Sequence, residues 1–468
     1  MTLKDPLEHS IDSKGLADAE FIQIRYTDVP GKFLARYITN DSRDDLQSGI
    51  GLDGSSVRGF TKIEDSDLLL VPDRSTLKLT NLSGYKIAMM IADVYNGFGR
   101  GRLVRDPRNV SQLMEAHLAR EGLSCLVGPE VECFVFDDIV FGGKRGPEIL
   151  SSEHAGKYPI RRKCGYDVPP FQDSLTELRF EIAEIMKKDY LIKVTNLNHE
   201  VASSGQIEIN FVHSTPTKAA DTVQLYKDTV RSVAKKHGKV ANFMPKPVFD
   251  ENDSRSDDSD NGSGMHVSIS LWAGSTNIFY DSSDNYAELS QAGRYFIGGV
   301  LTHLSSLSAL AAPTVNSYYR LVPGFEAPVF AAWSKGNRSA VVRVPVNDRN
   351  NTKSKRIEFR ATDPSANPYL ALSAIVSAGL DGIRKKTEPG DPVNENIYKM
   401  SDSVRNSHMI RSLPSNLQES IEALKSDCDY LKPCFESDLI ETHITLKQEE
   451  IDYAGRSRER QFKLYYDI

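Results

Sequence analysis

The sequence has few cysteines and no cysteine motif. Its five cysteines, an odd number among 468 residues, include no pair spaced Cys-x-x-Cys. A disulfide framework uses paired cysteines, and structural zinc sites use closely spaced thiolates. The sequence therefore argues against both, and it favours a reducing compartment, so we expect a cytoplasmic protein.

An excess of positive charge is also missing. Lys and Arg together number 57 against 64 Asp and Glu, which gives a net charge of −7. A basic excess is what neutralises a nucleic-acid backbone or attracts a protein to an anionic membrane. We therefore expect no nucleic acid and no membrane among the partners, and the chemistry of small molecules becomes the expected class of function.

Long hydrophobic runs are absent as well. Residues 1–15 are charged and lack the apolar core of a signal peptide. Residues 295–319 contain no Lys, Arg, Asp or Glu, but Ser, Thr, Gly, His303 and Pro313 interrupt the apolar residues. We predict a buried helix and loop there, not a membrane span.

What is present indicates two folded units. The runs FIQIRYTD and KFLARYI, joined by Val29, Pro30 and Gly31, are typical of a hairpin and open a β-rich unit. Asp106 and Pro107 then give the start signals of a helix. Beyond them, five strand-like runs alternate with helical segments near 174–189, 216–237 and 367–386. We therefore predict domains 1–105 and 106–468 and an α+β fold.

Two glutamates lie two positions apart in a run that is typical of a buried strand. Glu130 and Glu132 occur in GPEVECFVF, where strand alternation places both side chains on one face. Adjacent carboxylates repel each other, so such a pair shares a proton, binds a cation or lies at a solvated edge. The apolar neighbours make plain exposure the less favourable alternative.

Other strand-like segments add acids and one histidine. Glu200 and Glu208 flank a glycine-containing bend in NHEVASSGQIEI, and His266 begins the alternating run MHVSISLW. In RIEFRA, Glu358 and Arg360 share a strand face, for which a salt-bridged surface is the alternative. Taken singly, each segment has an ordinary structural explanation.

Together these side chains indicate metal and phosphate chemistry. Five carboxylates and one histidine, without a thiolate, suit Mg²⁺ or Mn²⁺ better than structural zinc. Two such ions imply phosphate chemistry. Positive charges suited to a polyphosphate lie between the histidine run and the last glutamate, namely Arg320, Arg338, Arg343 and Lys353. The sequence has no Walker loop GxxxxGK[ST], so a nucleotide would need another scaffold.

Six segments, in this order and spacing, resemble glutamine synthetase of the bacterial and archaeal type I class over essentially the whole chain. They are GLDGSSVRGF, GPEVECFVF, NHEVASSGQIEI, NGSGMH, NSYYRLVPGFEAP with NRSAVVRVP, and RIEFRATDPSANPYLALSAIVSAGLDGI. The resemblance implies a small N-terminal β-grasp-like domain and a large C-terminal catalytic domain with a curved antiparallel sheet or barrel and surrounding helices. It also implies dodecamers of two stacked hexameric rings, with active sites between subunits.

The resemblance assigns the metal ligands and the substrate contacts. Two or more Mg²⁺ or Mn²⁺ ions are implied per site: the ligands near glutamate are Glu132, Glu200 and Glu208, and those near the ATP phosphates are Glu130, His266 and Glu358. The glutamate contacts are Asn261, Gly262, Arg320 and Arg360. The phosphate contacts are Arg338, Arg343 and Lys353, and the nucleotide contacts further include Ser268 and Ser270. The family usually has histidines in place of Asn198 and Ser268, so we expect altered ATP affinity with retained chemistry.

The implied reaction is the ATP-dependent ligation of ammonia to the γ-carboxylate of L-glutamate. It proceeds through γ-glutamyl phosphate and gives L-glutamine, ADP and phosphate. The resemblance implies an ammonium pocket in which Asp53 accepts the proton and Glu326 closes over the intermediate; the other members are Ser56, Tyr166 and Glu200. From the residues alone, Asp53 and Ser56 are better explained as turn residues, and Tyr166 as an ordinary loop aromatic.

Two alternatives to this function remain open at the level of sequence. One is a γ-glutamyl-amine ligase that uses a polyamine or monoamine on the same scaffold. The other is a catalytically silent relative with a nitrogen-regulatory role. The six intact ligand positions speak against the silent relative, and the acidic pocket favours ammonium over bulkier amines.

Two further segments carry expectations of their own. Residues 250–264 form an acidic insert that resembles a calcium loop, but its twelfth ligand position is Ser268 instead of glutamate, so we expect a solvated loop. Tyr398 resembles a tyrosine that some relatives adenylylate, but the following KMSDSVRNS differs from theirs. We expect an unmodified surface tyrosine.

Overall fold

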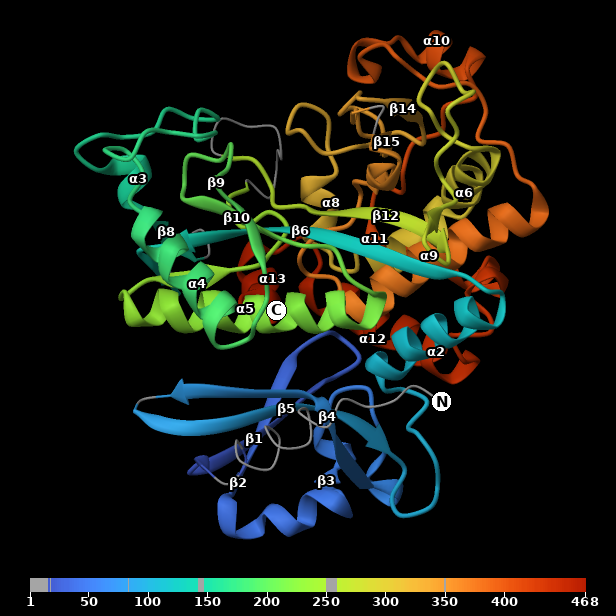
Figure 1. Cartoon of the computed structure of the whole chain (residues 1–468). Helices are drawn as coiled ribbons and strands as arrows, with labels where there is room; N and C mark the ends of the chain where they lie inside the picture. The colour runs from blue at the N-terminus through green and yellow to red at the C-terminus, as the bar shows by residue number, and fades with distance from the viewer. Residues whose placement is uncertain (1–15, 17, 83, 142–146, 250–258, 349–350) are drawn as a thin grey trace.

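The computed structural model describes residues 16, 18–82, 84–141, 147–249, 259–348 and 351–468. Most of the acidic insert, residues 250–258, lies outside the described residues. Figure 1 shows two main bodies, a small N-terminal sheet and a larger sheet surrounded by helices. The predicted α+β character is therefore present in both the order and the arrangement of the elements.

The N-terminal body is a five-stranded sheet with the order β2-β1-β5-β4-β3. β1 and β2 form the predicted antiparallel hairpin, whereas β1 and β5 pair in parallel. The hairpin turn is closed by Asp28, whose Oδ1 accepts hydrogen bonds from the backbone N–H groups of Gly31 and Lys32. The strands are β1 (Phe21–Thr27), β2 (Phe33–Thr39), β3 (Ile50–Asp53), β4 (Asp67–Leu82) and β5 (Tyr85–Tyr95).

The large sheet has the order β14-β15-β16-β12-β6-β10-β9, with β11 paired to β6 and β13 paired to β12. All of its pairs are antiparallel except β14 with β15. Its strands are β6 (Ser124–Phe136), β9 (Val194–His199), β10 (Gln206–Phe211), β11 (Val240–Asn242), β12 (Met265–Ala273), β13 (Thr276–Asn277), β14 (Trp333–Lys335), β15 (Val342–Val344) and β16 (Ile357–Phe359). A separate hairpin consists of β7 (Asp138–Val140) and β8 (Glu148–Leu150).

The helices begin where the sequence places caps and prolines. The Asp106 side chain accepts a hydrogen bond from the N–H of Arg108, and Pro107 is the first residue of α2. The α-helices are α2 (Pro107–Arg120), α3 (Ser152–Ala155), α4 (Thr176–Lys188), α5 (Pro216–Lys236), α6 (Gln291–Thr302), α7 (Leu304–Ala311), α8 (Ser317–Arg320), α9 (Pro368–Lys385), α10 (Asp402–Ser407), α11 (Leu417–Ser426), α12 (Ser437–Ala454) and α13 (Arg458–Tyr465). Short 3₁₀ turns are η1 (Asn40–Gln47), η2 (Gly54–Ser56), η3 (Ile63–Asp65), η4 (Thr352–Ser354), η5 (Ile397–Lys399) and η6 (Asp429–Leu431).

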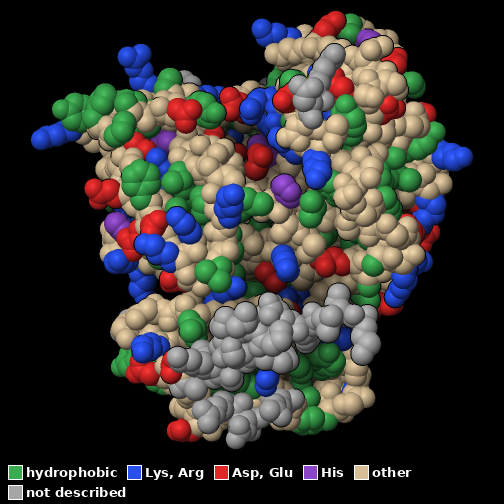
Figure 2. Space-filling model, in the orientation of Figure 1, with side chains coloured by type: hydrophobic (Ala, Val, Ile, Leu, Met, Phe, Trp, Pro, Cys, Tyr) green, Lys and Arg blue, Asp and Glu red, His purple; other side chains and the backbone are tan. Residues whose placement is uncertain are grey.

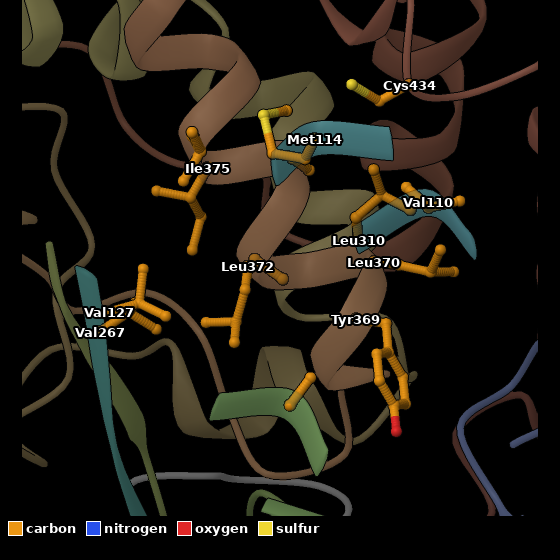
Figure 3. Close-up of a cluster of buried hydrophobic side chains, with 14 of the residues drawn as sticks. Val110, Met114, Val127, Val267, Leu310, Tyr369, Leu370, Leu372, Ile375 and Cys434 are labelled. Atoms are coloured by element: carbon orange, nitrogen blue, oxygen red, sulfur yellow. The ribbon is translucent and has the colours of Figure 1, made fainter. Parts of the chain in front are cut away.

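The helix α9 lies at the centre of the catalytic body. Its residues 368–382 are all buried, as expected for a helix that is apolar on every side. Figure 3 shows Leu370, Leu372 and Ile375 of this helix packed among side chains of α2, β6, β12 and α7. On another side α9 meets α6 backbone to backbone, where a Cβ on Gly299 would lie 2.1 Å from the carbonyl oxygen of Ala378.

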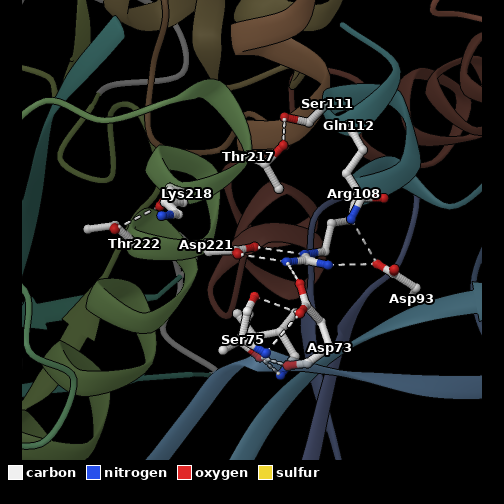
Figure 4. Close-up of polar contacts among 12 residues, drawn as sticks. Asp73, Ser75, Asp93, Arg108, Ser111, Gln112, Thr217, Lys218, Asp221 and Thr222 are labelled. Carbon is white, nitrogen blue, oxygen red and sulfur yellow. Dashed lines mark hydrogen bonds and ion pairs between the residues drawn. The ribbon is translucent and has the colours of Figure 1, made fainter. Parts of the chain in front are cut away.

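One arginine joins the two bodies. Arg108 on α2 donates to Asp93 on β5, to Asp73 on β4 and to both carboxylate oxygens of Asp221 on α5 (Figure 4). The hydroxyl of Tyr369 adds a 2.6 Å hydrogen bond to Asp221. This buried guanidinium therefore connects the N-terminal sheet to two helices of the catalytic body.

The uncharged stretch 295–319 is buried, as the sequence predicts, and the C-terminal tail packs against the large sheet. The stretch contributes to α6, α7 and α8, whose residues are mostly buried. No helix in the described parts of the chain is both long enough and apolar enough to span a bilayer. In the tail, Phe462 and Tyr465 are buried against Phe134 and Phe136 of β6 and their neighbours.

Candidate active site

A polar cavity of about 1200 Å³ opens beside the large sheet. In Figure 2, acidic and histidine side chains gather next to cationic ones in the hollowed centre of the catalytic body. The lining includes fourteen of the residues that the sequence singles out: Glu130, Glu132, Tyr166, Glu200, Glu208, Asn261, Gly262, His266, Arg320, Glu326, Arg338, Arg343, Glu358 and Arg360. Residues from many separate segments of the chain therefore line one space.

Strand register brings the acids together. Glu132 on β6 lies opposite Glu208 on β10, and Glu130 on β6 lies opposite His266 on β12. Glu358 on β16 pairs with Ser268, two positions from His266 on the same face of β12. Because side chains alternate along a strand, a single register places all five groups on the face that lines the cavity.

Glu130, His266 and Glu358 form a group able to hold a cation. One ligand atom from each lies within 4.8 Å of the others, and His266 Nδ1 is 3.8 Å from Glu130 Oε2. Burial, reinforced by Arg360, lowers the pKa of His266 well below its usual value, so the ring is neutral and has a lone pair for a metal. Two carboxylates and one neutral imidazole fit a divalent cation such as Mg²⁺ or Mn²⁺.

Arginine side chains border this group. Arg343 Nε donates to Oε2 of Glu358 at 2.9 Å, and Arg360 Nη1 donates to Oε1 at 2.5 Å. Despite burial, these two guanidinium groups lower the pKa of Glu358. Glu358 therefore remains an ionised ligand.

Glu132, Glu200 and Glu208 form a second set of buried acids. Burial raises their pKa values to about 7, about 10 and about 8, and repulsion from neighbouring glutamates, Glu130 among them, adds to each shift. A cation with two positive charges relieves such repulsion, and the carboxylate oxygens suit the same hard ions. This donor set fits a second divalent cation.

The glycines of NGSGMH leave room for Arg320. A Cβ on Gly264 would lie 2.6 Å from Nη2 of Arg320, and one on Gly262 would lie 2.9 Å from Cγ of Arg320. The buried guanidinium donates to the backbone carbonyls of residues 360–362 beneath the cavity. Asn261, the first residue of this motif, has a buried Oδ1 without a hydrogen-bond partner among the residues that the structure describes, so it is available to a ligand.

Comparison with known proteins agrees with this geometry. Residues 104–465 match the model of the glutamine synthetase catalytic domain, and residues 18–97 match that of the glutamine synthetase beta-Grasp domain. The glutamine synthetase of Sulfolobus acidocaldarius is 43% identical over 445 residues, which cover 92% of each chain. That of Streptomyces filamentosus is 39% identical over 469 residues, which cover 96% of this chain and 97% of the relative. The chain belongs to the glutamine synthetase family.

A solved structure supports the same assignment. The cryo-EM structure of Plasmodium falciparum glutamine synthetase superposes with a TM-score of 0.84 at 26% identity, covering 100% of this chain and 99% of that chain. The predicted β-grasp N-terminal domain and large catalytic domain are thus confirmed. The prediction of an ATP-dependent glutamate–ammonia ligase is confirmed as well, and neither the amine ligase nor the silent relative is favoured.

Five predicted glutamine synthetase residues do not line the cavity of this chain. Asp53 ends β3 and Ser56 ends the following turn η2 in the N-terminal body, where Asp53 accepts hydrogen bonds from Ser55 and Ser56. The others are Ser268, Ser270 and Lys353. Ser270 Oγ accepts from the indole N–H of Trp272, and Lys353 is exposed in η4. Their proposed roles therefore depend on substrates or a second chain.

The structure also adds residues that the sequence did not single out. Gln206 Nε2 donates to Oε2 of Glu132 at 3.1 Å, and the side-chain amide of Asn210 donates to Oε1 of Glu208 at 2.8 Å. Gln206 and Asn210 lie two positions before and after Glu208 on the same strand face. Strand alternation in the sequence could therefore have indicated both. Other added lining residues are Lys163, Asn196, Phe325, Lys335, Asn337, Ser339, Asn394 and Asn396. Most lie in loops, for which no such period exists.

Proposed function

We propose that the cavity joins ammonia to glutamate in two steps. The γ-carboxylate oxygen attacks the γ-phosphorus of ATP, the bond to the bridging oxygen breaks, and ADP leaves. The nitrogen of ammonia then attacks the carbonyl carbon of γ-glutamyl phosphate. The bond from this carbon to the phosphate oxygen breaks, and the nitrogen gives up one proton, so the products are the amide and hydrogen phosphate. The observation that carries the proposal is the convergence of six metal-ligand side chains and four arginines on one cavity.

Each group of lining residues has a part in this scheme. Glu130, His266 and Glu358 hold one Mg²⁺ or Mn²⁺ ion, and Glu132, Glu200 and Glu208 hold another. Bound there, the ions supply positive charge to the phosphate oxygens. Glutamate is oriented by Asn261, Gly262, Arg320 and Arg360. The phosphates are bound by Arg338, Arg343 and Lys353, and the nucleotide lies along Ser268 and Ser270.

The ammonium pocket combines residues of two chains in this proposal. Tyr166, Glu200 and Glu326 come from one chain, and Asp53 and Ser56 come from its neighbour. Hydrogen bonds from Ser55 and Ser56 lower the pKa of Asp53, so its carboxylate is ionised at neutral pH and attracts NH₄⁺. Asp53 then accepts the proton that frees the lone pair, and Glu326 shields the acyl phosphate from water.

A shared pocket requires an oligomer. Asp53 is fully exposed, and Tyr166 is 59% exposed at the edge of the cavity, which leaves both available to a neighbouring chain. Heterologous contacts of this kind close into rings. We propose a cytoplasmic dodecamer of two hexameric rings. We also propose that the domain boundary lies near residue 105, which is supported by the start of α2 at Pro107 and by the gap, residues 98–103, between the two matched family models.

Mixing two inactive variants tests the shared site. Asp53→Ala and Glu358→Ala each lose glutamine formation, but co-assembled from equal amounts they regain roughly a quarter of the wild-type activity, since random mixing leaves that share of sites intact in a closed ring. If Asp53 acts within its own chain, every mixed site has one defect and the mixture stays inactive. Replacing ammonium by polyamines in the same assay tests which amine is the substrate. Release of phosphate only with a polyamine would overturn the proposal that ammonium is the substrate.

A further inference from the structure

The segment around Glu326 is held at three points. We call residues 322–328 the flap. The ammonium group of Lys163 donates to the carbonyl of Gly324 at 3.0 Å, and the hydroxyl of Tyr398 donates to the carbonyl of Ala327 at 2.8 Å. These two contacts lie on either side of Glu326.

The third point is the ring of Phe325. Two ammonium groups lie over it, Lys246 Nζ at 3.2 Å and Lys163 Nζ at 3.8 Å from the ring centroid. A cation over an aromatic face is attracted by the quadrupole of the ring, and more strongly where water is excluded. Phe325 is therefore fixed by residues from two other segments of the chain.

Lys246 is a buried amine, and burial, reinforced by the charge of Lys163, lowers its pKa to about 7, so near neutral pH it lies over this ring as a cation for part of the time. The residue is completely buried, and its Nζ has no hydrogen-bond partner among the described residues. An amine in such a place is costly, so structures that retain one use it. The contact that the structure gives it is with Phe325.

Glu326 needs this support because its backbone is strained. Its φ of +60° lies in the left-handed region, which an L-residue other than glycine, asparagine or aspartate seldom adopts. Strain of this kind persists where neighbouring contacts enforce it. The anchors on Gly324, Phe325 and Ala327 are those contacts, and Glu326 itself lines the cavity.

We propose that Lys163, Lys246 and Tyr398 are positioning residues that hold the flap so that Glu326 faces the acyl phosphate. They thereby determine how much of the intermediate reacts with ammonia and how much with water. Tyr398 lines the cavity and is half-buried, so it is not the plain surface tyrosine that the sequence indicates. The inference rests on the proposed role of Glu326 in shielding the intermediate.

The test measures ATP hydrolysed per glutamine formed, together with KM for ammonium and for ATP. Tyr398→Phe removes a single hydroxyl, and Lys246→Met removes the charge at nearly constant length. Loss of one anchoring contact is expected to raise both the hydrolysis ratio and KM for ammonium about fivefold, with KM for ATP unchanged. Tyr453→Phe and Lys425→Met, both exposed and remote from the flap, are the matched controls.

Glu326→Ala distinguishes the proposed role of Glu326 from the proposed role of the residues that anchor the flap. If it leaves the hydrolysis ratio unchanged, the proposed role of Glu326 is wrong. If it raises the ratio while Tyr398→Phe stays fully coupled with unchanged KM for ammonium, Glu326 shields the intermediate but the anchors do not position it, and the inference is overturned. Thermal unfolding of Lys246→Met shows whether that variant is folded, and Tyr398→Phe decides the matter if it is not.

Discussion

Glu208 on β10 lies directly opposite Glu132 on β6, so two carboxylates face each other across neighbouring strands inside the protein. Like charges in this position destabilise a sheet, and burial adds to the cost. Burial and the charge of Glu132 raise the pKa of Glu208 to about 8, and burial, with a smaller part from Glu130, raises the pKa of Glu132 to about 7. The arrangement opposes folding at alkaline pH and favours a bound cation.

Glu208→Gln is therefore expected to stabilise the fold and to impair the enzyme. In chelator at pH 9 the free energy of unfolding rises by about 1 kcal/mol, because the opposed charges are removed. At pH 6 the gain is smaller, since both carboxyls are then largely protonated in the folded state. Glutamine formation falls by more than about a hundredfold. Loss of a residue that only hydrogen-bonds to a metal ligand already costs about 10- to 100-fold, and loss of the ligand itself should cost more.

Thermal unfolding with and without Mn²⁺ measures both the gain in stability and the loss of metal binding. The shift that Mn²⁺ produces in wild type shrinks in Glu208→Gln, whereas the exposed Glu64→Gln behaves as wild type. A variant that loses stability in chelator at pH 9 would contradict the repulsion argument.

Asp28 should make stability fall with pH in a defined window. Burial raises its pKa to about 6 from 3.8, so the folded state binds the proton more tightly than the unfolded chain. Protonated Asp28 therefore contributes up to about 3 kcal/mol to the free energy of unfolding. This contribution is fully present below about pH 4 and is lost as pH rises through about 6. Asp28→Asn keeps an Oδ1 for the N–H groups of Gly31 and Lys32 but has no charge to bury.

Chemical unfolding at pH 4 to 8, in chelator, checks this. Asp28→Asn is expected to be more stable than wild type at pH 8 and to lose less stability between pH 4 and pH 6. The exposed Asp67→Asn is the matched control. Parallel stability curves for Asp28→Asn and wild type would show that Asp28 is not the group that titrates.

Arg108→Met should loosen the connection between the two bodies. The change leaves Asp73, Asp93 and Asp221 without their shared guanidinium, and breaking a buried ion pair costs about 3–5 kcal/mol. Adding Asp221→Asn removes one buried carboxylate that has lost its partner, and is expected to recover part of the lost stability. Denaturant unfolding measures both variants against the exposed Arg74→Met, and an unaltered midpoint for Arg108→Met would refute the linking role.

Gly299→Ala tests the contact between α6 and α9. A methyl group there would lie 2.1 Å from the carbonyl of Ala378 and 2.6 Å from the backbone nitrogen of Gly382, and backbone atoms cannot yield as a side chain can. Overpacking of this kind costs about 3 kcal/mol, which outweighs the better helix propensity of alanine. The midpoint of thermal unfolding reports the change. Gly51→Ala, with open space around its Cβ position, should be nearly neutral.

Local signals predicted most elements because they depend on neighbours in the chain. The hairpin around Gly31, the start of α2 at Pro107 and the alternation of β12 each follow from a few adjacent residues. The same period of two placed Glu130 and Glu132 on one face. Where no period exists, as in the loops that supply Lys163 and Asn396, no pattern of residues indicates a site.

The sequence by itself determined the types of chemistry, the donor residues and the family to which they belong, because residue identity and strand alternation are local properties. Only the tertiary structure decided that Glu132 faces Glu208, that Arg343 and Arg360 bind Glu358, and that two lysines and a tyrosine hold the flap. Each of these joins segments far apart in the chain, and sheet register and burial bring them together. Side-chain charge can be read from a sequence, but the distance between two charges is set by the fold.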